Sequence, residues 1–148
     1  MENLSRNFTL EELISSDTAK AKGINNTPGA IEKQNLKLLA QTVLQPIRDK
    51  YGKPISVTSG YRCPKLNAAV GGSKTSQHLK GQAADIKCTA TTKAELFNLI
   101  KDMINKGELT VGQLIWEYGT KNAPRWIHVS VNHANNSEKN NQIVFVGI

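Results

Sequence analysis

The sequence predicts a single α+β domain in which helices pack on an antiparallel sheet. Three observations support this class. Two segments repeat apolar residues at helical spacing, five short segments have the pattern of strands, and no internal repeat, low-complexity tract or linker divides the 148 residues. A chain of this length needs only one hydrophobic core. We therefore treat residues 1–148 as one domain.

The first helix is predicted to begin after Thr9. Thr9 and Glu12 form a capping box, in which a hydroxyl and a carboxylate satisfy free backbone donors of the first turn. The helix is expected to end near residues 15–17. A polar loop is predicted to follow it.

The second helix is predicted to be the main core helix. Thr27 followed by Pro28 supplies an N-cap residue and a proline at the first helical position. Pro46 lies inside the later part of the apolar pattern, so we expect it to kink or end the last turn. The apolar residues recur at spacings of three and four and form one face: Leu36, Leu39, Ala40, Val43, Leu44 and Ile47.

Strand and turn signals come next. Residues 55–58 alternate like a half-buried strand that ends at Gly60. A short helical piece is predicted over residues 65–70. A polar loop over residues 73–80 then leads to a strand over residues 81–88.

The second half of the chain adds a helix and further strands. Thr92 and Glu95 form another capping box, which opens a helix closed by a left-handed cap at Gly107. The apolar residues of this helix share one face. Three strands are predicted after it, over residues 111–117, 126–131 and 143–146.

The composition limits the classes of function. Apolar residues make up 39% of the chain and charged residues 21%, as in an ordinary globular protein. The formal net charge of +7 predicts a surface that attracts polyanions. Because the lysines and arginines are spread out, with no basic stripe interleaved with aromatics, we expect no nucleic-acid partner. No segment is long enough to span a bilayer, so we expect no membrane partner.

Two histidines and a carboxylate form a candidate metal site. His78 lies in the polar loop and Asp85 in the strand after it, and both residue types suit zinc. Gly81 allows the chain to turn between them. His128 stands in an otherwise apolar strand, where burying an unpaired imidazole would be costly. On these residues alone, the first pair remains compatible with ordinary surface groups and His128 with a core histidine bonded to backbone.

The spacing of these residues resembles a known family, the zinc peptidases of the bacterial cell wall. That family includes D-alanyl-D-alanine carboxypeptidases and L-alanyl-D-glutamate endopeptidases. Its upstream S-G-Y-R element and its downstream histidine strand also have counterparts here, so the resemblance covers residues 55–131. The signature S-x-H-x-x-G-x-A-x-D is matched in full, by Ser76, His78, Gly81, Ala83 and Asp85.

The resemblance implies a hedgehog-like peptidase fold with one zinc ion. The ion would be held by His78, Asp85 and His128, with a fourth position open to water. It also implies that Arg62 holds a carboxylate of the substrate, a peptidoglycan stem peptide, and that Ser76 adds a hydrogen bond. From the residues alone, Arg62 could instead make a surface salt bridge and Ser76 could bond its own loop backbone.

The general base is the point at which the chain departs from the family pattern. Many members carry an acidic residue three positions before the last histidine, where this chain has Arg125. We therefore predict that Glu117 is the base. If Glu117 pairs with Trp126, the two-residue period of a strand puts its side chain on the same face as His128. A slip of one residue would turn it away and leave a solvated strand end.

The predicted function is therefore zinc-dependent hydrolysis of amide bonds in stem peptides, by a carboxypeptidase or an endopeptidase. The alternative is a non-catalytic, zinc-containing module that binds cell wall, as the related hedgehog domain suggests and as Arg125 would favour. A basic nucleic-acid-binding protein is a third possibility, which predicts affinity that falls steeply with salt.

Further expectations concern the protein in the cell. The first residues lack the apolar stretch of a secretory signal, so we expect accumulation in the cytoplasm, compatible with release to the wall during phage or prophage lysis. We expect a monomer. Cys63 and Cys88 show no metal-binding spacing and are expected to be small buried thiols; a disulfide bridge between them is the alternative.

Other candidate residues carry weaker signals. Gln77, Tyr61 and Trp126 could line the cleft, and the two aromatics could equally belong to the core. His133 lies in a polar stretch and is expected to be solvent-exposed rather than a ligand. The glycine pair at residues 71–72 lacks the flanking strand and lysine of a phosphate loop, so it is a flexible turn.

Overall fold

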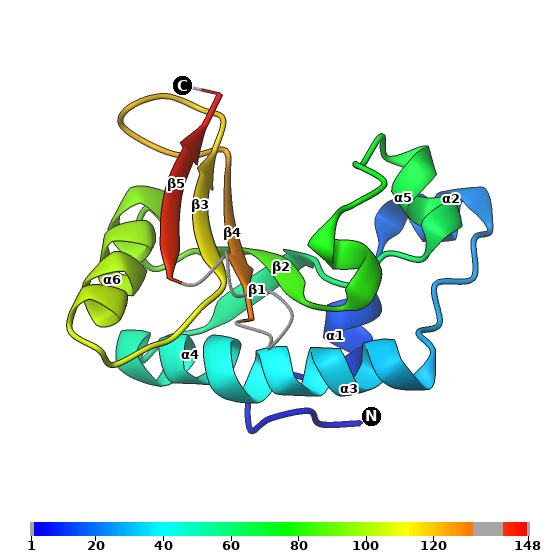
Figure 1. Cartoon of the computed structure of the whole chain (residues 1–148), viewed down its shortest axis with the longest axis horizontal. Coiled ribbons are helices and arrows are strands. Elements are labelled where there is room, and N and C mark those ends of the chain that lie inside the picture. Colours follow the sequence, from blue (N-terminus) through cyan, green and yellow to red (C-terminus); the bar gives the residue numbers. More distant parts are fainter. Residues whose placement is uncertain (1, 132–140, 148) are drawn as a thin grey trace.

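The computed structural model of the chain describes residues 2–131 and 141–147. A five-stranded sheet lies at its centre, with the strand order β1-β2-β4-β3-β5. A long helical segment runs beneath the sheet and a second helix covers its other end (Figure 1). The strands are β1 (Ile55–Ser59), β2 (Ala83–Cys88), β3 (Gln113–Glu117), β4 (Trp126–Ser130) and β5 (Gln142–Val146).

The predicted α+β class is confirmed, with one difference in the sheet. The β1/β2, β2/β4 and β3/β4 pairs are antiparallel, but β5 runs parallel to β3. The chain enters β5 beside the start of β3, where the Asn141 N–H donates to the Val111 carbonyl and the Gln142 N–H to the Gly112 carbonyl. Alternation of apolar residues has the same period in both kinds of pair, so it could not predict this direction.

The main core helix is continuous from α3 (Ala30–Leu39) through a π-helical turn, η1 (Ala40–Leu44), to α4 (Gln45–Tyr51). Pro46 neither ends nor interrupts it, because the turn before the proline widens and the Gln45 N–H donates to the Ala40 carbonyl. A π-helical turn is a rare irregularity inside α-helices, and here it lies directly before the proline.

The predicted start of this helix was wrong. Gly29 is the N-cap, and α3 begins at Ala30 rather than at Pro28. The Thr27 backbone N–H and hydroxyl both donate to Asn25 Oδ1. This local turn uses the Thr27 groups that would otherwise cap the helix.

The N-terminal helices agree only in part with the prediction from the sequence. Helix α1 (Leu10–Ile14) is capped by Thr9 as predicted. The predicted polar loop after it is wrong, because α2 (Asp17–Lys22) begins there, capped by the Ser16 hydroxyl. Only one residue of α2, Ala19, is buried, so the helix has no apolar periodicity by which to recognise it.

The remaining helices are close to expectation. Helix α5 (Pro64–Ala69) follows β1, and a 3₁₀ turn, η2 (Gln77–Lys80), ends the predicted polar loop. Helix α6 (Lys93–Asn105) is capped by Thr92. It packs against the C-terminal strands, where Phe97 lies edge-on to the Trp116 ring with centroids 5.1 Å apart.

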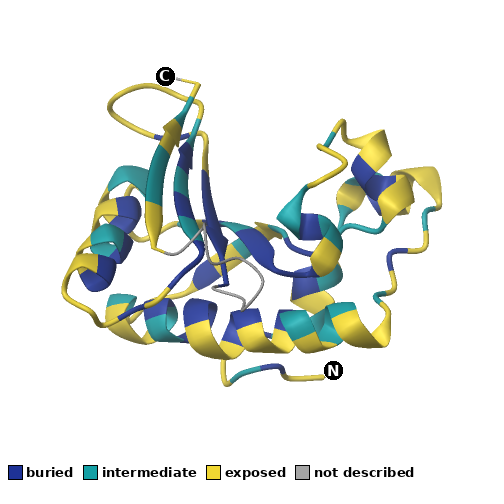
Figure 2. Cartoon of the chain, viewed as in Figure 1, coloured by how far each residue is buried: buried dark blue, intermediate teal, exposed yellow. Residues whose placement is uncertain are grey.

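The strand period divides the sheet into two faces. The residues buried between the sheet and the helices include Ile86, Trp116 and Ile127, and they form one core with α3, η1, α4 and α6 (Figure 2). The opposite face carries Asp85, Glu117 and His128. Because successive side chains alternate, the apolar core residues of β2, β3 and β4 fix which polar residues point the other way.

In the part of the chain that the structure describes, no helix combines the length and apolarity needed to cross a membrane. Both cysteines are free thiols and half-buried. Cys63 Sγ accepts a hydrogen bond from the Leu66 N–H and so caps α5, while Cys88 Sγ donates to the Thr91 carbonyl. Neither residue belongs to the candidate site described next.

Candidate metal centre

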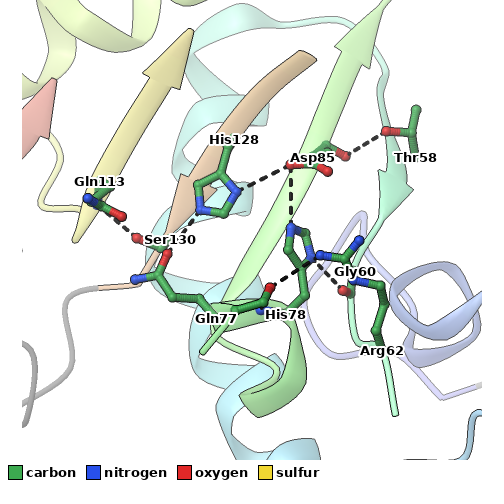
Figure 3. Close-up of polar contacts among 10 residues, drawn as sticks. Thr58, Gly60, Arg62, Gln77, His78, Asp85, Gln113, His128 and Ser130 are labelled. Atoms are coloured by element: carbon green, nitrogen blue, oxygen red, sulfur yellow. Dashed lines mark hydrogen bonds and ion pairs between the residues drawn. The ribbon is translucent and has the colours of Figure 1, made fainter. Parts of the chain in front are cut away.

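Three predicted ligands converge on one point of the polar sheet face. His78 comes from η2, Asp85 from β2 and His128 from β4, where Asp85 and His128 are register partners. Asp85 Oδ1 lies 3.5 Å from His78 Nε2 and 3.3 Å from His128 Nδ1 (Figure 3). All three candidate ligand atoms lie within 4.8 Å of one another. The structure thus brings together all three residues of the predicted site.

A tight turn delivers His78 to the site. The Ser76 hydroxyl accepts from the His78 backbone N–H, which starts η2. Gly81 ends it with a φ of +71°, and a Cβ at Gly81 would lie 2.6 Å from the Glu32 carbonyl oxygen. Only glycine fits both this conformation and this close approach. The turn that the sequence predicted at Gly81 is therefore confirmed.

Each imidazole is oriented by a hydrogen bond from its other nitrogen. His78 Nδ1 donates to the Gly60 carbonyl at 2.7 Å, and His128 Nε2 donates to Gln77 Oε1 at 3.0 Å. These acceptors place the ring protons on the atoms that face away from Asp85. The remaining nitrogens, Nε2 of His78 and Nδ1 of His128, can then offer lone pairs to a cation.

Asp85 supplies the observation that tests whether a cation fits. Its Oδ1 atom is buried and receives no hydrogen bond in the described part of the chain. Burial alone would raise the pKa of Asp85, but the two imidazoles beside Oδ1, His128 and then His78, outweigh burial and hold the pKa well below its ordinary value. Three basic atoms thus meet at one point that either a proton or a metal ion must occupy.

The ligand set fits zinc. Two imidazole nitrogens and one carboxylate oxygen are common zinc ligands, and three protein ligands are the number found in catalytic rather than structural sites. The ligands form the floor of an open cleft of about 750 Å³, which leaves a fourth position accessible. The residues that line this cleft come from β3 and β4 on one side and from the start of α2 and the segment after α5 on the other; Figure 1 shows where these elements lie.

Glu117 lies on the wall of the same cleft. It pairs with Trp126, so the predicted register is confirmed and Glu117 shares a face with His128. The pKa of Glu117 is raised, first by burial and then by the negative charge of Asp85, against the opposing charges of His128, His78 and Arg62.

Arg125, which replaces the acidic residue found in many relatives, does not reach this centre. Its backbone N–H donates to the Glu117 carbonyl, and its guanidinium carbon lies 5.6 Å from the centre of the Trp126 ring. Glu117 therefore remains the candidate base of this chain.

Arg62 and Ser76 contact each other at the β1 side of the cleft. Arg62 Nη2 donates to Ser76 Oγ at 3.2 Å. Burial lowers the pKa of Arg62, opposed by the charges of Asp85 and Glu117, and its Nε atom is buried without an acceptor in the described residues. No carboxylate of the described chain forms a salt bridge with Arg62. A partly desolvated guanidinium with a free donor is suited to receive a substrate carboxylate.

The candidate residues with weaker sequence signals differ in where the structure places them. Gln77, Tyr61 and Trp126 all line the cleft. Tyr61 is buried in the core as well, whereas Trp126 is exposed. His133 lies outside the described residues. The Gly60 carbonyl was missed, because a backbone acceptor leaves no signal in the sequence.

Tyr118, another cleft residue, was also missed. It stands directly after the predicted strand in the sequence, but nothing in its neighbours indicated that it faces the cleft. An exposed tyrosine after a strand is compatible with many loop positions.

A candidate cation site with three protein ligands and an accessible fourth position, set in a cleft, is typical of metallohydrolases. The family model Peptidase M15 matches residues 6–130, and the chain belongs to this family of zinc peptidases of the D-Ala-D-Ala carboxypeptidase and endopeptidase type. The protein is therefore a metallopeptidase. Among curated proteins, none matches the chain.

Proposed function

We propose that this metallopeptidase hydrolyses an amide bond in the stem peptides of peptidoglycan, with one zinc ion held by His78, Asp85 and His128. The observation that carries the proposal is the convergence of three ligand atoms within 4.8 Å at the floor of a cleft whose wall also carries Glu117. A metal site, a base and an open cleft are the three requirements of metal-assisted amide hydrolysis.

The proposed roles follow from position. A bound zinc ion supplies Lewis acidity, which acidifies water and polarises the scissile carbonyl. Glu117 takes the proton of the attacking water on a carboxylate oxygen and passes it to the nitrogen of the leaving amine. The raised pKa of Glu117 brings its proton affinity closer to that task.

Substrate orientation is assigned to Arg62 and Ser76. The Arg62 guanidinium donates to a carboxylate of the stem peptide, and Ser76, already in contact with Arg62, adds its hydroxyl. This carboxylate lies on the β1 side of the zinc ligands. We assign it to the part of the substrate that leaves as the amine product, which is the direction of binding that the proposal adopts.

The test is a digest of purified peptidoglycan by the zinc-loaded protein, followed by mass spectrometry of the released fragments. The proposal predicts new peptide termini that increase with time, disappear when a chelator removes zinc and return when zinc is restored. A protein that carries zinc and releases no new termini would refute the proposed hydrolysis.

A second candidate is a non-catalytic zinc module that binds cell wall, which the presence of Arg125 in place of an acidic residue favours. Such a module would sediment with insoluble peptidoglycan and release nothing from it. The same digest distinguishes the two candidates, provided that binding and release are measured in the same tubes.

A further inference from the structure

An aromatic group at the end of the cleft has no role in the proposed hydrolysis. Tyr118 and Trp126 form this rim group together with Arg125. Their rings meet edge to face with centroids 5.7 Å apart, and the Arg125 guanidinium lies against the Trp126 ring. Both rings line the cleft, yet 47% of Tyr118 and 38% of Trp126 remain exposed. The cleft therefore ends in an open aromatic surface.

The backbone holds Tyr118 in an unusual conformation. Its φ is +57°, a left-handed value that costs a residue other than glycine of order 1–3 kcal/mol. The Tyr118 N–H donates to the Val146 carbonyl at 2.7 Å. The neighbouring Gly147 lies so close that a Cβ there would be 2.4 Å from Tyr118 Cδ1. The ring is thus held in place before any ligand binds, which is characteristic of strained residues at ligand-contact positions.

Arg62 and Tyr118 of the rim group lie on opposite sides of β2 and β4, the strands that carry Asp85 and His128. Arg62 follows β1, and the strand order places β2 and β4 between β1 and β3. Trp126 lies two residues before His128 on the same face of β4, a separation of about 6.6–6.8 Å along the strand. An extended substrate covers that distance with about two residues. If Arg62 holds the leaving side of the substrate, the rim group meets the part about two units before the cleaved bond.

We propose that the rim group is a subsite for a sugar ring of the glycan to which the stem peptide is attached. The inference rests on the proposed function. Exposed tyrosine and tryptophan rings present apolar surface to the C–H face of a pyranose, and the Arg125 guanidinium offers donors to acetamido and hydroxyl oxygens. In peptidoglycan, a lactyl group and one alanine separate the sugar ring from the first peptide bond within the stem, the bond between its first and second residues.

The distance between the sugar subsite and the cleaved bond distinguishes an endopeptidase from a carboxypeptidase. A sugar bound two units before the cleaved bond is available only near the glycan end of the stem, and not at its free carboxyl end. The subsite therefore makes the protein an endopeptidase that acts on glycan-linked stem peptides rather than a carboxypeptidase.

The experiment compares kcat/KM for a disaccharide-linked stem peptide and for the same peptide without sugar. The wild-type protein should prefer the glycan-linked substrate by about tenfold, the scale of one aromatic contact. Trp126→Ala should bring this ratio close to one. Tyr118→Gly should reduce it as well, and it should remain folded because glycine relieves the strained φ. Phe145→Ala, which removes an exposed aromatic outside the cleft, is the matched control and should leave the ratio unchanged.

Equal rates on the two substrates, or release of only a C-terminal residue, would overturn the subsite while leaving the proposed hydrolysis intact. If the zinc-loaded protein cuts neither substrate, the proposed function fails. In that case the sugar subsite is tested separately. The free N-acetylglucosaminyl–N-acetylmuramic acid disaccharide is titrated into the protein, and the indole N–H signals are recorded by NMR. A shift of the Trp126 signal with no shift of Trp116 supports the subsite, and no shift of Trp126 overturns it.

Discussion

The two walls of the cleft are built in different ways. On the sheet wall, Asp85, His128 and Glu117 occupy neighbouring positions of three strands, and the ladder of β2, β4 and β3 alone sets their relation. On the opposite wall (the turn wall), Arg62 and His78 lie outside the strands, and a few hydrogen bonds position each of them. The Arg62 N–H donates to the His78 carbonyl, and the His78 ring donates to the Gly60 carbonyl.

This difference determines how each wall responds to change. A residue of the sheet wall is held by many backbone bonds, so replacing its side chain removes one chemical group and leaves the geometry. A residue of the turn wall depends on a few side-chain contacts, so a substitution outside the site can move it. The predictions below test this contrast.

The largest effect is expected from removing a ligand. His78→Ala should abolish stoichiometric zinc binding and hydrolysis together, because two protein ligands do not retain the ion in competition with water. The measurement is metal content after dialysis, with circular dichroism to show that the fold persists. His133→Ala, which changes the third histidine, is the matched control and should keep both properties. Full zinc content in His78→Ala would exclude this residue as a ligand.

A smaller loss of affinity is expected from Gln77, which links the two walls through its bond to His128 Nε2. Gln77→Leu removes this acceptor and should weaken zinc binding about 10–100-fold, the usual effect of losing a group that orients a ligand. Competition with a chelator measures it. Gln113→Leu changes another glutamine of the cleft, whose side chain donates to Gln142 Oε1 on β5, and it should bind zinc normally. Equal affinities for the two variants would show that Gln77 does not orient His128.

The turn wall should lose stability when Asn26 is replaced. This buried side chain donates to the carbonyls of Ile14 and Tyr61 and accepts from the Cys63 N–H, so it fixes the residues on both sides of Arg62. Asn26→Ala should lower the free energy of unfolding by about 2–3 kcal/mol. It should also raise KM, because Arg62 loses its support. Urea titration checks the first effect, and Asn122→Ala, at an exposed loop position away from this network, is the control. Similar unfolding energies for the two variants would contradict the contrast between the walls.

The smallest effect is electrostatic and concerns the sheet wall. In the zinc-free protein the pKa of Glu117 lies above its ordinary value, through burial and the charge of Asp85. Because the pKa of Glu117 is higher in the folded than in the unfolded protein, the protonated side chain stabilises the fold fully at pH values below the unfolded pKa. This stabilisation is lost as the pH rises through the folded pKa. Bound zinc should lower the Glu117 pKa by adding positive charge nearby. Carboxyl ¹³C NMR titrations with and without zinc measure both states, and a pKa that zinc leaves unchanged would place Glu117 away from the ion.

The same contrast explains how much the sequence could predict. The two strands that carry Glu117 and Trp126 followed from the apolar pattern. The pairing of these residues was a condition of the prediction, with a one-residue slip left open, and the ladder has that register. The motif from Ser76 to Asp85 likewise predicted which ligands converge. These features are local, or they repeat regularly along the chain, so the sequence contains the necessary information.

The features that could not be predicted depend on contacts between distant segments. Helix α2 buries only Ala19, so it has no apolar pattern. Strand β5 is parallel to β3, but its side chains alternate with the same period as in an antiparallel strand. Asn26 bonds to residues up to 37 positions away. Tyr118 owes its position to the close approach of Gly147. Such contacts leave no periodic signal in a single sequence.

The central claim is that the sheet register brings a base, Glu117, to a metal centre that forms without it. The most direct test is to measure zinc content and kcat for Glu117→Gln beside the wild-type protein. The variant should bind one equivalent of zinc and lose about 10²–10⁴-fold in kcat, the usual contribution of a general base. A kcat close to that of the wild type, with zinc retained, would contradict the claim.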